Sequence, residues 1–349
     1  MKQVMIVGKG GVGNLELREA PLPLPGPGQI RIKVQAAGVN FADVMMRLGL
    51  YPDAPKLPAV PGYEVAGVVD MVGSGVSSDW LEKPVLAMCN FGGYSEYVSL
   101  DEALVHLRPA QVSAVQGAAL LVNYLTAWQM VRVMAPAIEG DLVLIQSAAG
   151  GVGQAVIQLC ALSGARVVGS ASPSKHDFLR EQGVEFVFDS RRRDFATAVR
   201  AATGGRGVDI ALEPRNGPWI MESYNSLAKC GRLVLFGFSN AASGSGSGVI
   251  SSLKTLAAVP WLKLNPIRLM NDNKSLAGVN LGRMWDMGHK TGKWVEDLLV
   301  LLESGKINPV IDAVLPFSSA GEAHQRLENR LNVGKVILVP DAGDGVSVP

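Results

Sequence analysis

One glycine motif constrains the fold of this chain more than any other feature of the sequence. The pattern AxGxxG at 148–153 follows the apolar run 141–146 and precedes a helical pattern at 154–162, after which 165–171 is a second apolar run. A strand, a glycine turn, a helix and a second strand make a βαβ unit, whose helix N-terminus offers free amides to a pyrophosphate. The sequence therefore predicts a dinucleotide site, with a purely structural glycine turn as the alternative.

The glycines of this motif have distinct expected roles. Gly150 allows the turn, Gly151 keeps side chains away from the pyrophosphate, and Gly153 lets the helix pack closely against the strand. Ala149 and Val152 complete the loop that we expect to face the cofactor.

A stricter glycine pattern, GxGxxG at 8–13, has the wrong neighbours for a phosphate site. Residues 14–18 alternate like a strand, and prolines then forbid a helix at Pro21, Pro23, Pro25 and Pro27. The motif also lacks the Lys-Ser/Thr pair of a nucleotide-binding ATPase. We interpret it as a hairpin turn between two N-terminal strands.

The end of the second strand of the βαβ unit indicates which dinucleotide is bound. NAD sites usually place Asp or Glu there, whereas this chain has Ser172 and Lys175 and no carboxylate before Asp177. Lys175 and part of the arginine run 191–193 would attract a 2′-phosphate, although two of the three arginines are more typical of a solvated loop. The sequence favours NADPH over NADH.

The remaining sequence indicates two kinds of structure. Strand and helix patterns continue to alternate after Lys175, which is typical of a doubly wound α/β sheet. The segment before residue 120 is instead rich in Gly and Pro and predicts a β-rich, curled sheet. Strands are expected at 29–34, 65–72, 94–98, 185–188, 208–212, 231–237 and 336–339, and helices at 195–202, 220–228 and 294–303.

Two segments have no firm place in this scheme. The stretch 242–248 has low complexity and predicts a mobile loop. Segment 249–274 is expected to form a lid or a membrane-facing flap, or else to pack locally. The tail after Pro340 is expected to fray.

Composition excludes several classes of protein. The 349 residues carry a formal net charge of +1, which disfavours a general nucleic-acid binder. The three cysteines are far apart, and no apolar run approaches the ~18 residues of a spanning helix. No secretory leader opens the chain, so we expect a soluble cytoplasmic protein without an integral membrane segment.

Several motifs in series carry a family resemblance. They are GVNFAD at 38–43, RLGLY at 47–51, PGYEVAG at 61–67, LTA at 125–127, the glycine motif at 148–153 and NVGKVILVP at 332–340. Together they resemble the zinc-free medium-chain dehydrogenase/reductases of the quinone oxidoreductase (zeta-crystallin) type. Within that family the run 172–176 and the C-terminus are most similar to the vesicle amine transport protein homologues.

The resemblance implies an α/β architecture with two domains. A Rossmann domain with a doubly wound parallel sheet would bind NADPH over residues 123–304. A β-rich, GroES-like catalytic domain would combine 1–122 with 305–349. The resemblance also implies a homodimer.

The resemblance further implies which residues form the active site. Asn40, Tyr51 and Thr126 would surround the nicotinamide and the substrate, with Tyr51 as a candidate donor of a hydrogen bond or a proton. Asp43 is expected to be structural, and Asn123 either lines the site or starts a helix. The residues expected to bind the cofactor are Ala149, Gly150, Gly151, Val152, Gly153, Ser172, Lys175, Ser190, Phe236, Gly237, Phe238 and Arg330.

A metal is not expected. Asn40 and Tyr63 stand where the zinc-binding members of the wider family have Cys and His, and between Met88 and Val105 there is only Cys89. The four histidines share no motif and are expected to be structural or on the surface. The segment 213–217 departs from the family's usual Asp-x-x-Gly-Gly, which leaves contacts near the adenosine ribose open.

The expected function is metal-independent hydride transfer from NADPH to a quinone or an α,β-unsaturated carbonyl, whose conjugated oxygen takes up the developing charge. An enoyl-thioester reductase of fatty-acid or polyketide synthesis would use the same geometry. A non-catalytic nucleotide-sensing or lipid-associated protein is the alternative from another class.

Overall fold

The computed structural model describes residues 1–237 and 266–341, and the chain divides into two compact units. The predicted loop at 242–248, the first part of segment 249–274 and the tail from 342 lie outside the described residues.

The first unit consists of Met1–Val122 and the described residues from Met284 onward, and the second consists of the described residues between them. Residues 284–304 thus group with the first unit, whereas the sequence places the domain boundary at 304/305. The functional boundary stays a prediction.

The second unit is built on a six-stranded parallel sheet. The chain starts in the middle of the sheet, proceeds to one edge, and then resumes on the other side of the first strand in the order β10-β9-β8-β11-β12-β13. This confirms the predicted doubly wound sheet, and in such sheets ligands bind beyond the carboxyl ends of the strands where the order reverses. The strands are β8 (Leu142–Ile145), β9 (Arg166–Ala171), β10 (Phe186–Asp189), β11 (Val208–Glu213), β12 (Leu227–Leu235) and β13 (Ser275–Gly278).

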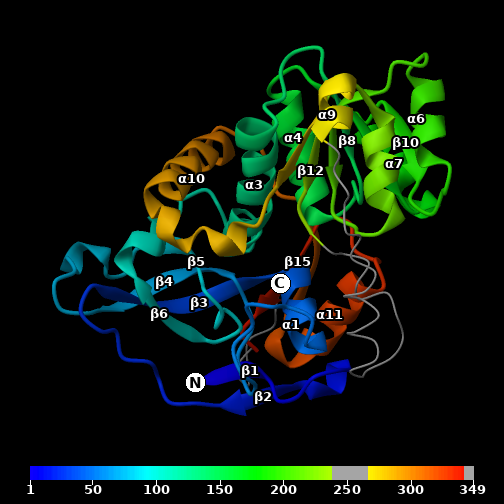
Figure 1. The fold of residues 1–349 in the computed structure, drawn as a ribbon. Helices are drawn as coiled ribbons and strands as arrows, with labels where there is room; N and C mark the ends of the chain where they lie inside the picture. The colour runs from blue at the N-terminus through cyan, green and yellow to red at the C-terminus, as the bar shows by residue number, and fades with distance from the viewer. Residues whose placement is uncertain (238–265, 342–349) are drawn as a thin grey trace. The chain divides into compact units, whose positions relative to one another are not determined.

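Helices cover both faces of this sheet, which explains why all four residues of β8 are buried. In Figure 1, α4 lies on the other side of the central strands from α6 and α7. On the side of α6 and α7, Phe195 and Tyr224 pack against Leu144 and Ala211 of the sheet. The helices are α3 (Leu121–Trp128), α4 (Gly151–Ala161), α5 (His176–Glu181), α6 (Phe195–Ala202), α7 (Pro218–Ser226) and α9 (Pro266–Asp272).

The first unit contains a seven-stranded mixed sheet in the order β14-β15-β3-β4-β5-β7, with β6 also paired to β3. The long strand β3 pairs with β4, β6 and β15, so the last strand of the chain completes a sheet begun by its N-terminal part. The strands are β3 (Gln29–Val39), β4 (Glu64–Val72), β5 (Pro84–Met88), β6 (Tyr97–Asp101), β7 (Val105–Leu107), β14 (Ile311–Pro316) and β15 (Lys335–Val339).

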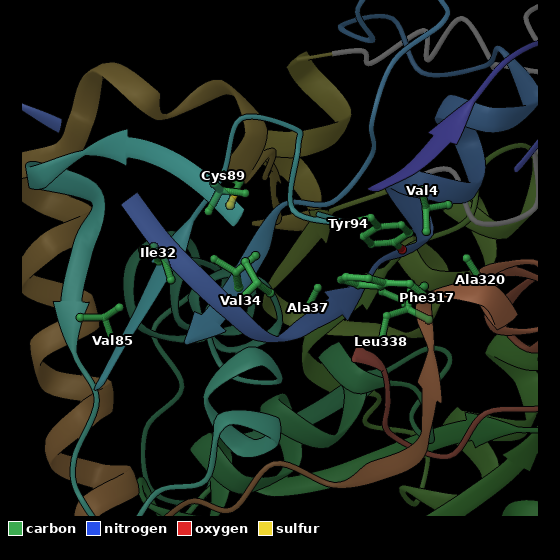
Figure 2. Packing of buried hydrophobic residues seen from close by; sticks show 14 of the residues in the cluster. Val4, Ile32, Val34, Ala37, Val85, Cys89, Tyr94, Phe317, Ala320 and Leu338 are labelled. Carbon is green, nitrogen blue, oxygen red and sulfur yellow. The ribbon is translucent and has the colours of Figure 1, made fainter. Parts of the chain in front are cut away.

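The core of the first unit lies against this sheet. Figure 2 shows Ile32 and Val34 of β3 in one cluster with Val85 of β5 and Leu338 of β15. Alternate residues of β3 point into the cluster, as expected for a strand with a period of two. The helices of this unit are α1 (Phe41–Leu48), α2 (Ala114–Ala118), α10 (Gly288–Glu303) and α11 (Ala320–Glu328).

The N-terminal hairpin is confirmed. Strand β1 (Lys2–Ile6) pairs antiparallel with β2 (Leu15–Glu19), and Ile6 lies opposite Leu15. The GxGxxG pattern therefore connects two strands rather than a strand and a helix.

Candidate functional site

The loop between β8 and α4 ends in free backbone donors. Gly150 is the N-cap of α4 and has an extended backbone, and the first helical bond runs from Gln154 N to Gly150 O at 2.9 Å. The amides of Gly151, Val152 and Gly153 donate no hydrogen bond to any other part of the chain that the structure describes. Three free amides at the positive end of an eleven-residue helix are the arrangement that anions bind in other proteins.

Contacts with the surrounding protein leave little space for a side chain at two positions of this loop. A Cβ atom at Gly153 would lie 2.3 Å from the backbone oxygen of Ala148. A Cβ atom at Gly151 would lie 2.1 Å from Nδ2 of Asn123, a buried residue of α3. Asn123 therefore packs against the loop from a helix, which favours the prediction that it lines the site. Thr126, one turn further along α3, is also buried.

Two buried glutamine side chains, Gln146 and Gln154, form hydrogen bonds next to the glycine loop. Ser170 Oγ donates to Gln146 Oε1, and Gln154 Nε2 donates to the Ala148 oxygen at 3.0 Å. Both glutamines are 1% exposed. Among the described residues, nothing pairs with Gln146 Nε2 or Gln154 Oε1.

The other predicted cofactor residues of the second unit lie where the strands end. Ser172 and Lys175 follow β9, Ser190 follows β10, and Phe236 with Gly237 follows β12. The carboxyl ends of parallel strands meet at one edge of a sheet, so these residues share that edge with the β8 loop. Phe238 lies outside the described residues, and Arg330 lies in the first unit.

The segment 213–217, which departs from the family pattern, is held by a buried ion pair between Arg215 and Glu213. Arg215 donates from Nε and Nη2 to the two carboxylate oxygens of Glu213, at 2.8 and 3.0 Å, and both side chains are at most 5% exposed. Its Nη1 donates to the backbone oxygen of Ser190 at 3.1 Å, and its guanidinium lies 4.0 Å from the ring centroid of Trp219. Arg215 thereby connects the carboxyl end of β11 to the carboxyl end of β10.

Two of the three arginines at 191–193 form local surface ion pairs. Arg191 binds Asp189 at 2.7 Å and Arg192 binds Asp194 at 2.6 Å. The Arg191 guanidinium holds the pKa of the Asp189 carboxyl low, at about 2. Both pairs are local contacts in an exposed loop, as expected for two of the three.

The first glycine motif is held by the protein itself. Gly10 N donates to the backbone oxygen of Arg47 at 2.9 Å, and Arg47 Nη1 donates back to the Gly10 oxygen. Arg47 is fully buried and pairs with Glu328 of α11 at 2.6 Å. Asn14 N donates to the Gly11 oxygen at 3.1 Å. This loop anchors the hairpin to α1 and α11.

A buried polar cluster surrounds Asn40 in the first unit. Asn40 Oδ1 accepts from Lys335 Nζ at 2.6 Å, and its Nδ2 donates to Glu64 Oε1 at 3.0 Å and to the Gly38 oxygen at 3.3 Å. Lys335 also forms an ion pair with Glu64, which accepts from Val122 N at 2.8 Å through its other oxygen. The amide of Asn40 is thus fully engaged by the protein, which makes it a positioning residue rather than a free donor.

Asp43 lies in a second buried cluster and is structural in its contacts. Its carboxylate accepts from the backbone of Asn40 at 2.8 Å and of Gly62 at 2.9 Å, and from Tyr94 Oη at 3.1 Å. Burial raises the pKa of Asp43 to about 6. Tyr94 Oη also lies 3.4 Å from Nε2 of His324, whose pKa burial and the nearby Arg47 lower to about 3.

Tyr51 lies in an aromatic cluster with Tyr63 and Phe91. The ring centroids of Tyr51 and Tyr63 are 6.0 Å apart, and those of Tyr63 and Phe91 are 5.0 Å apart. Tyr51 is half-buried, whereas Tyr63 is buried. The predicted residues Asn40 and Tyr51 thus lie in the first unit, and Thr126 lies in the second.

The residues present do not fit a zinc ion. Asn40 and Tyr63 stand where Cys and His would be expected, and neither is a usual zinc ligand. In the described part of the chain, no three His, Cys, Asp or Glu side chains are grouped so that they could hold a metal ion.

Four residues of these clusters are not predicted from the sequence: Glu64, Lys335, Arg215 and the buried Tyr63. Glu64 and Lys335 stand within the quoted family motifs, but a charge in a strand pattern shows no partner far along the chain. A valine directly follows each charge, in Glu64-Val65 and Lys335-Val336, and a charge beside apolar strand residues is a usable sign of a buried ion pair.

Comparisons with known proteins cover nearly the whole chain. The family of zinc-binding dehydrogenases matches residues 182–338, and the alcohol dehydrogenase GroES-like domain matches residues 26–110. The synaptic vesicle membrane protein VAT-1 homolog of Rattus norvegicus is 35% identical over 345 residues, which is 97% of this chain and 84% of that protein.

Two further relatives carry information on an activity or a ligand. The quinone oxidoreductase of Sus scrofa is 29% identical over 315 residues, 88% of each chain. A mycobacterial protein solved in complex with NADPH is 31% identical, with a TM-score of 0.85 over 97% of this chain and 100% of that chain. Among the described residues, no helix has the length and apolar character that a membrane crossing requires.

Proposed function

The chain belongs to the medium-chain dehydrogenase/reductase family of oxidoreductases, and from this premise we propose that it transfers hydride from NADPH to a quinone or an α,β-unsaturated carbonyl. The observation that carries the proposal is that the amides of Gly151, Val152 and Gly153 at the start of α4 donate to no described residue, on a loop that the Ala148 backbone approaches closely at Gly153. Such a loop fits a pyrophosphate, which needs backbone donors at close range.

The residues that would hold NADPH follow from the sheet. Gly151, Val152 and Gly153 would bind the pyrophosphate, with Ala149 and Gly150 shaping the turn. Ser172, Lys175 and Ser190 lie at the ends of the two neighbouring strands on the adenosine side. Phe236 and Gly237 follow β12, on the nicotinamide side of the point where the strand order reverses.

The protein's own part in the reaction is to position and to stabilise. Bound NADPH would supply the hydride. Tyr51 and Thr126 are the proposed side chains around the reacting atoms, and Asn40 would hold its neighbours in place through Glu64 and Lys335. A hydrogen bond to the substrate oxygen stabilises the charge that develops there during reduction.

Lys175 supports the choice of NADPH. It is the half-buried last residue of a short turn after β9, and no carboxylate stands at the end of that strand. A cation at this position would bind the 2′-phosphate that distinguishes NADPH from NADH. The mycobacterial relative, which was solved with NADPH, agrees with this choice.

The test is a titration followed by turnover measurements. NADPH and NADH binding are measured by nucleotide fluorescence for the wild type, Lys175→Ala and the exposed control Lys229→Ala. We expect about a tenfold weaker NADPH affinity for Lys175→Ala only, with NADH unchanged, since a bond to a charged group contributes about 1.5–3 kcal/mol. Equal losses for both nucleotides would remove Lys175 from the 2′-phosphate site.

NADPH oxidation is then followed with quinones, short enones and enoyl-thioesters. Turnover of quinones or enones supports the proposal, and turnover of enoyl-thioesters alone would assign the chain to carrier-bound substrates. NADPH binding without any turnover would favour a nucleotide-sensing protein. The homodimer stays a prediction, which light scattering on the purified protein would test.

A further inference from the structure

The segment that departs from the family pattern, 213–217, contains a charged side chain that the proposed function does not use, that of Arg215. Although it follows the carboxyl end of β11, Arg215 is 5% exposed, and its partner Glu213 is fully buried. Glu213 accepts from Arg215 through both carboxylate oxygens, and Ser223 Oγ donates to its Oε2 at 2.6 Å. Because a buried charge is costly unless it is paired and hydrogen-bonded, this pair is a built part of the edge. The charge of Arg215 is neutralised within the protein, so Arg215 is suited to hold the backbone in place rather than to bind an anion.

The bond from Arg215 Nη1 to Ser190 O joins loops that follow two distant strands of the sheet. In the order β10-β9-β8-β11, two strands lie between β10, which precedes Ser190, and β11, which precedes Arg215. Three strand spacings amount to about 14 Å. The chain closes this distance because Ser190 N donates to Ala171 O at the end of β9, at 2.9 Å, and the arginine side chain reaches toward Ser190 from the other side. The bond therefore lies near the carboxyl ends of the central strands, the edge where ligands bind in doubly wound sheets.

The same segment also contacts the residues that follow β12. Phe236 N donates to Glu213 O at 3.2 Å, and a Cβ atom at Gly237 would lie 3.3 Å from Pro214 O. The segment thus has Ser190 on one side and Gly237 on the other, and both are residues of the proposed cofactor site. A displacement of this segment would change the positions of both.

Trp219 restricts the orientation of the guanidinium. The guanidinium carbon of Arg215 lies 4.0 Å from the centroid of the Trp219 ring, and Trp219 is the second residue of α7. α6 and α7 lie on one face of the sheet, opposite α4 (Figure 1), and Glu222 of α7 accepts from Ala196 N of α6 at 2.9 Å. The loops that lead into α6 and α7 are therefore joined twice, once by Arg215 and once between the helices.

We propose that Arg215 is a positioning residue for the cofactor: its bond to Ser190 holds the loop after β10 where this loop receives the adenosine half of NADPH. The glycine loop leads into α4 on the other face of the sheet, so the adenosine half would lie between the glycine loop and the loops that Arg215 joins. A site that is already in place binds more tightly than one that the ligand must order. This assignment rests on the proposed function and adds a residue to its cofactor site.

The test compares Arg215→Lys with the matched control Arg200→Lys. Lysine keeps a positive charge beside Glu213, but it lacks the planar group that binds Glu213 and Ser190 at once. Arg200 is in the same unit and also donates to three backbone oxygens, near the amino ends of β11 and β12. Both variants should lose stability, because each loses hydrogen bonds, but only Arg215→Lys should change the cofactor site.

The ligand is ADP-ribose, which contains the adenosine half and the pyrophosphate of the cofactor but no nicotinamide. By calorimetry we expect about tenfold weaker binding by Arg215→Lys and binding within about twofold of the wild type by Arg200→Lys, because in Arg215→Lys the ligand must order the loop after β10. Equal affinities of the wild type and Arg215→Lys would overturn the proposal. Tighter binding by Arg215→Lys would also overturn it, since Arg215 would then obstruct the site.

Hydrogen exchange gives a second measurement that does not depend on affinity. In the protein without ligand, segment 189–195 should exchange its amide protons about threefold faster or more in Arg215→Lys than in the wild type or Arg200→Lys, because the loop loses one of its bonds. Unchanged exchange in this segment would overturn the role of Arg215 in holding the loop.

The ADP-ribose titration separates this proposal from the proposed function, because it requires no turnover. Weaker ADP-ribose binding by Arg215→Lys supports the positioning role even if neither a quinone nor an enone is reduced. Equal binding by the two proteins, together with turnover of quinones or enones, would leave the proposed function in place and remove Arg215 from it. Wild-type protein that binds no ADP-ribose would overturn the adenosine site and the role of Arg215 together.

Discussion

The two glycine loops of this chain have similar sequences but differ in what their backbone amides bind within the protein. In the loop at 8–13 the Gly10 amide and carbonyl are both bound by Arg47, so the protein itself uses the polar groups of the backbone. In the loop at 148–153 the amides of Gly151, Val152 and Gly153 donate to no described residue, because a helix begins there. The element that follows a glycine motif, and not the spacing of its glycines, decides whether amides remain for a ligand.

The comparison predicts that the first loop matters for stability and the second for the cofactor. The largest expected effect is that of Arg47→Met, which breaks a buried ion pair and leaves the Gly10 oxygen without its donor. We expect the free energy of unfolding to fall by about 3 kcal/mol, with NADPH affinity of the folded protein unchanged. Urea unfolding with nucleotide titration checks both, and Arg18→Met on the exposed pair with Glu16 is the control.

A loss of NADPH binding in folded Arg47→Met, at unchanged stability, would contradict this division between the loops. The Arg18→Met control should change stability by at most about 0.5 kcal/mol.

Alanine at equivalent positions should separate the loops next. Gly153→Ala places a methyl group against the Ala148 oxygen, whereas a Cβ at Gly13 meets nothing within 4 Å. We expect a loss of about 1–3 kcal/mol for Gly153→Ala and a change within about 0.5 kcal/mol for Gly13→Ala, measured by urea unfolding. Similar losses in both variants would contradict the difference in packing between Gly13 and Gly153.

Low pH should lower the free energy of unfolding because His324, which contacts Arg47 beside the first glycine loop, takes up a proton on unfolding. The pKa of His324 is about 3 in the fold, against an ordinary 6.5, so the unfolded chain binds more protons in between. The contribution of His324 to the free energy of unfolding is present above pH 6.5 and is lost as the pH falls toward 3. Asp43, whose pKa is raised to about 6, acts in the opposite sense between about pH 4 and 6, because there the fold binds the extra proton.

The variant His324→Gln isolates the histidine. When the pH is lowered from 6.5 to 4, the free energy of unfolding should fall by less in His324→Gln than in the wild type. The two falls should differ by on the order of 1–2 kcal/mol. Arg47 and Tyr94 face the ring and remain in the variant. Parallel pH profiles for the two proteins would show that His324 does not titrate with unfolding.

The smallest expected effect concerns affinity alone. Gly151→Ala meets only the end of the Asn123 side chain, which can yield. We expect NADPH affinity to fall about tenfold, which is about 1.4 kcal/mol, and the double variant with Asn123→Ala to recover part of it. Additive losses in this double-mutant cycle, followed by nucleotide fluorescence, would mean that Asn123 does not hold the loop.

The sequence predicts the second unit well because its signals are local. The apolar run of β8, the glycine turn and the helix pattern of α4 lie next to one another in the chain, and the model confirms all three. The same holds for the first hairpin. Strand boundaries differ from the predicted ones by a few residues, as at Leu227, where β12 begins four residues before the predicted 231.

The buried clusters of the first unit could not be predicted in the same way. Lys335 and Glu64 are 271 residues apart in the chain, and Arg47 and Glu328 are 281 apart. No periodicity connects residues at such separations. Family motifs in the sequence point to Asn40 and Tyr51, but the engagement of the Asn40 amide depends on Lys335, 295 residues further along the chain.

The pairing of β15 with β3 has a consequence for biosynthesis. The sheet of the first unit receives the strand 335–339 only after the ribosome has passed these residues, and the ion pair of Glu64 with Lys335 cannot form before then. The second unit lies between these segments and carries its parallel sheet without them. We therefore expect nascent chains to fold the second unit first, while the N-terminal strands stay incompletely paired and accessible to chaperones.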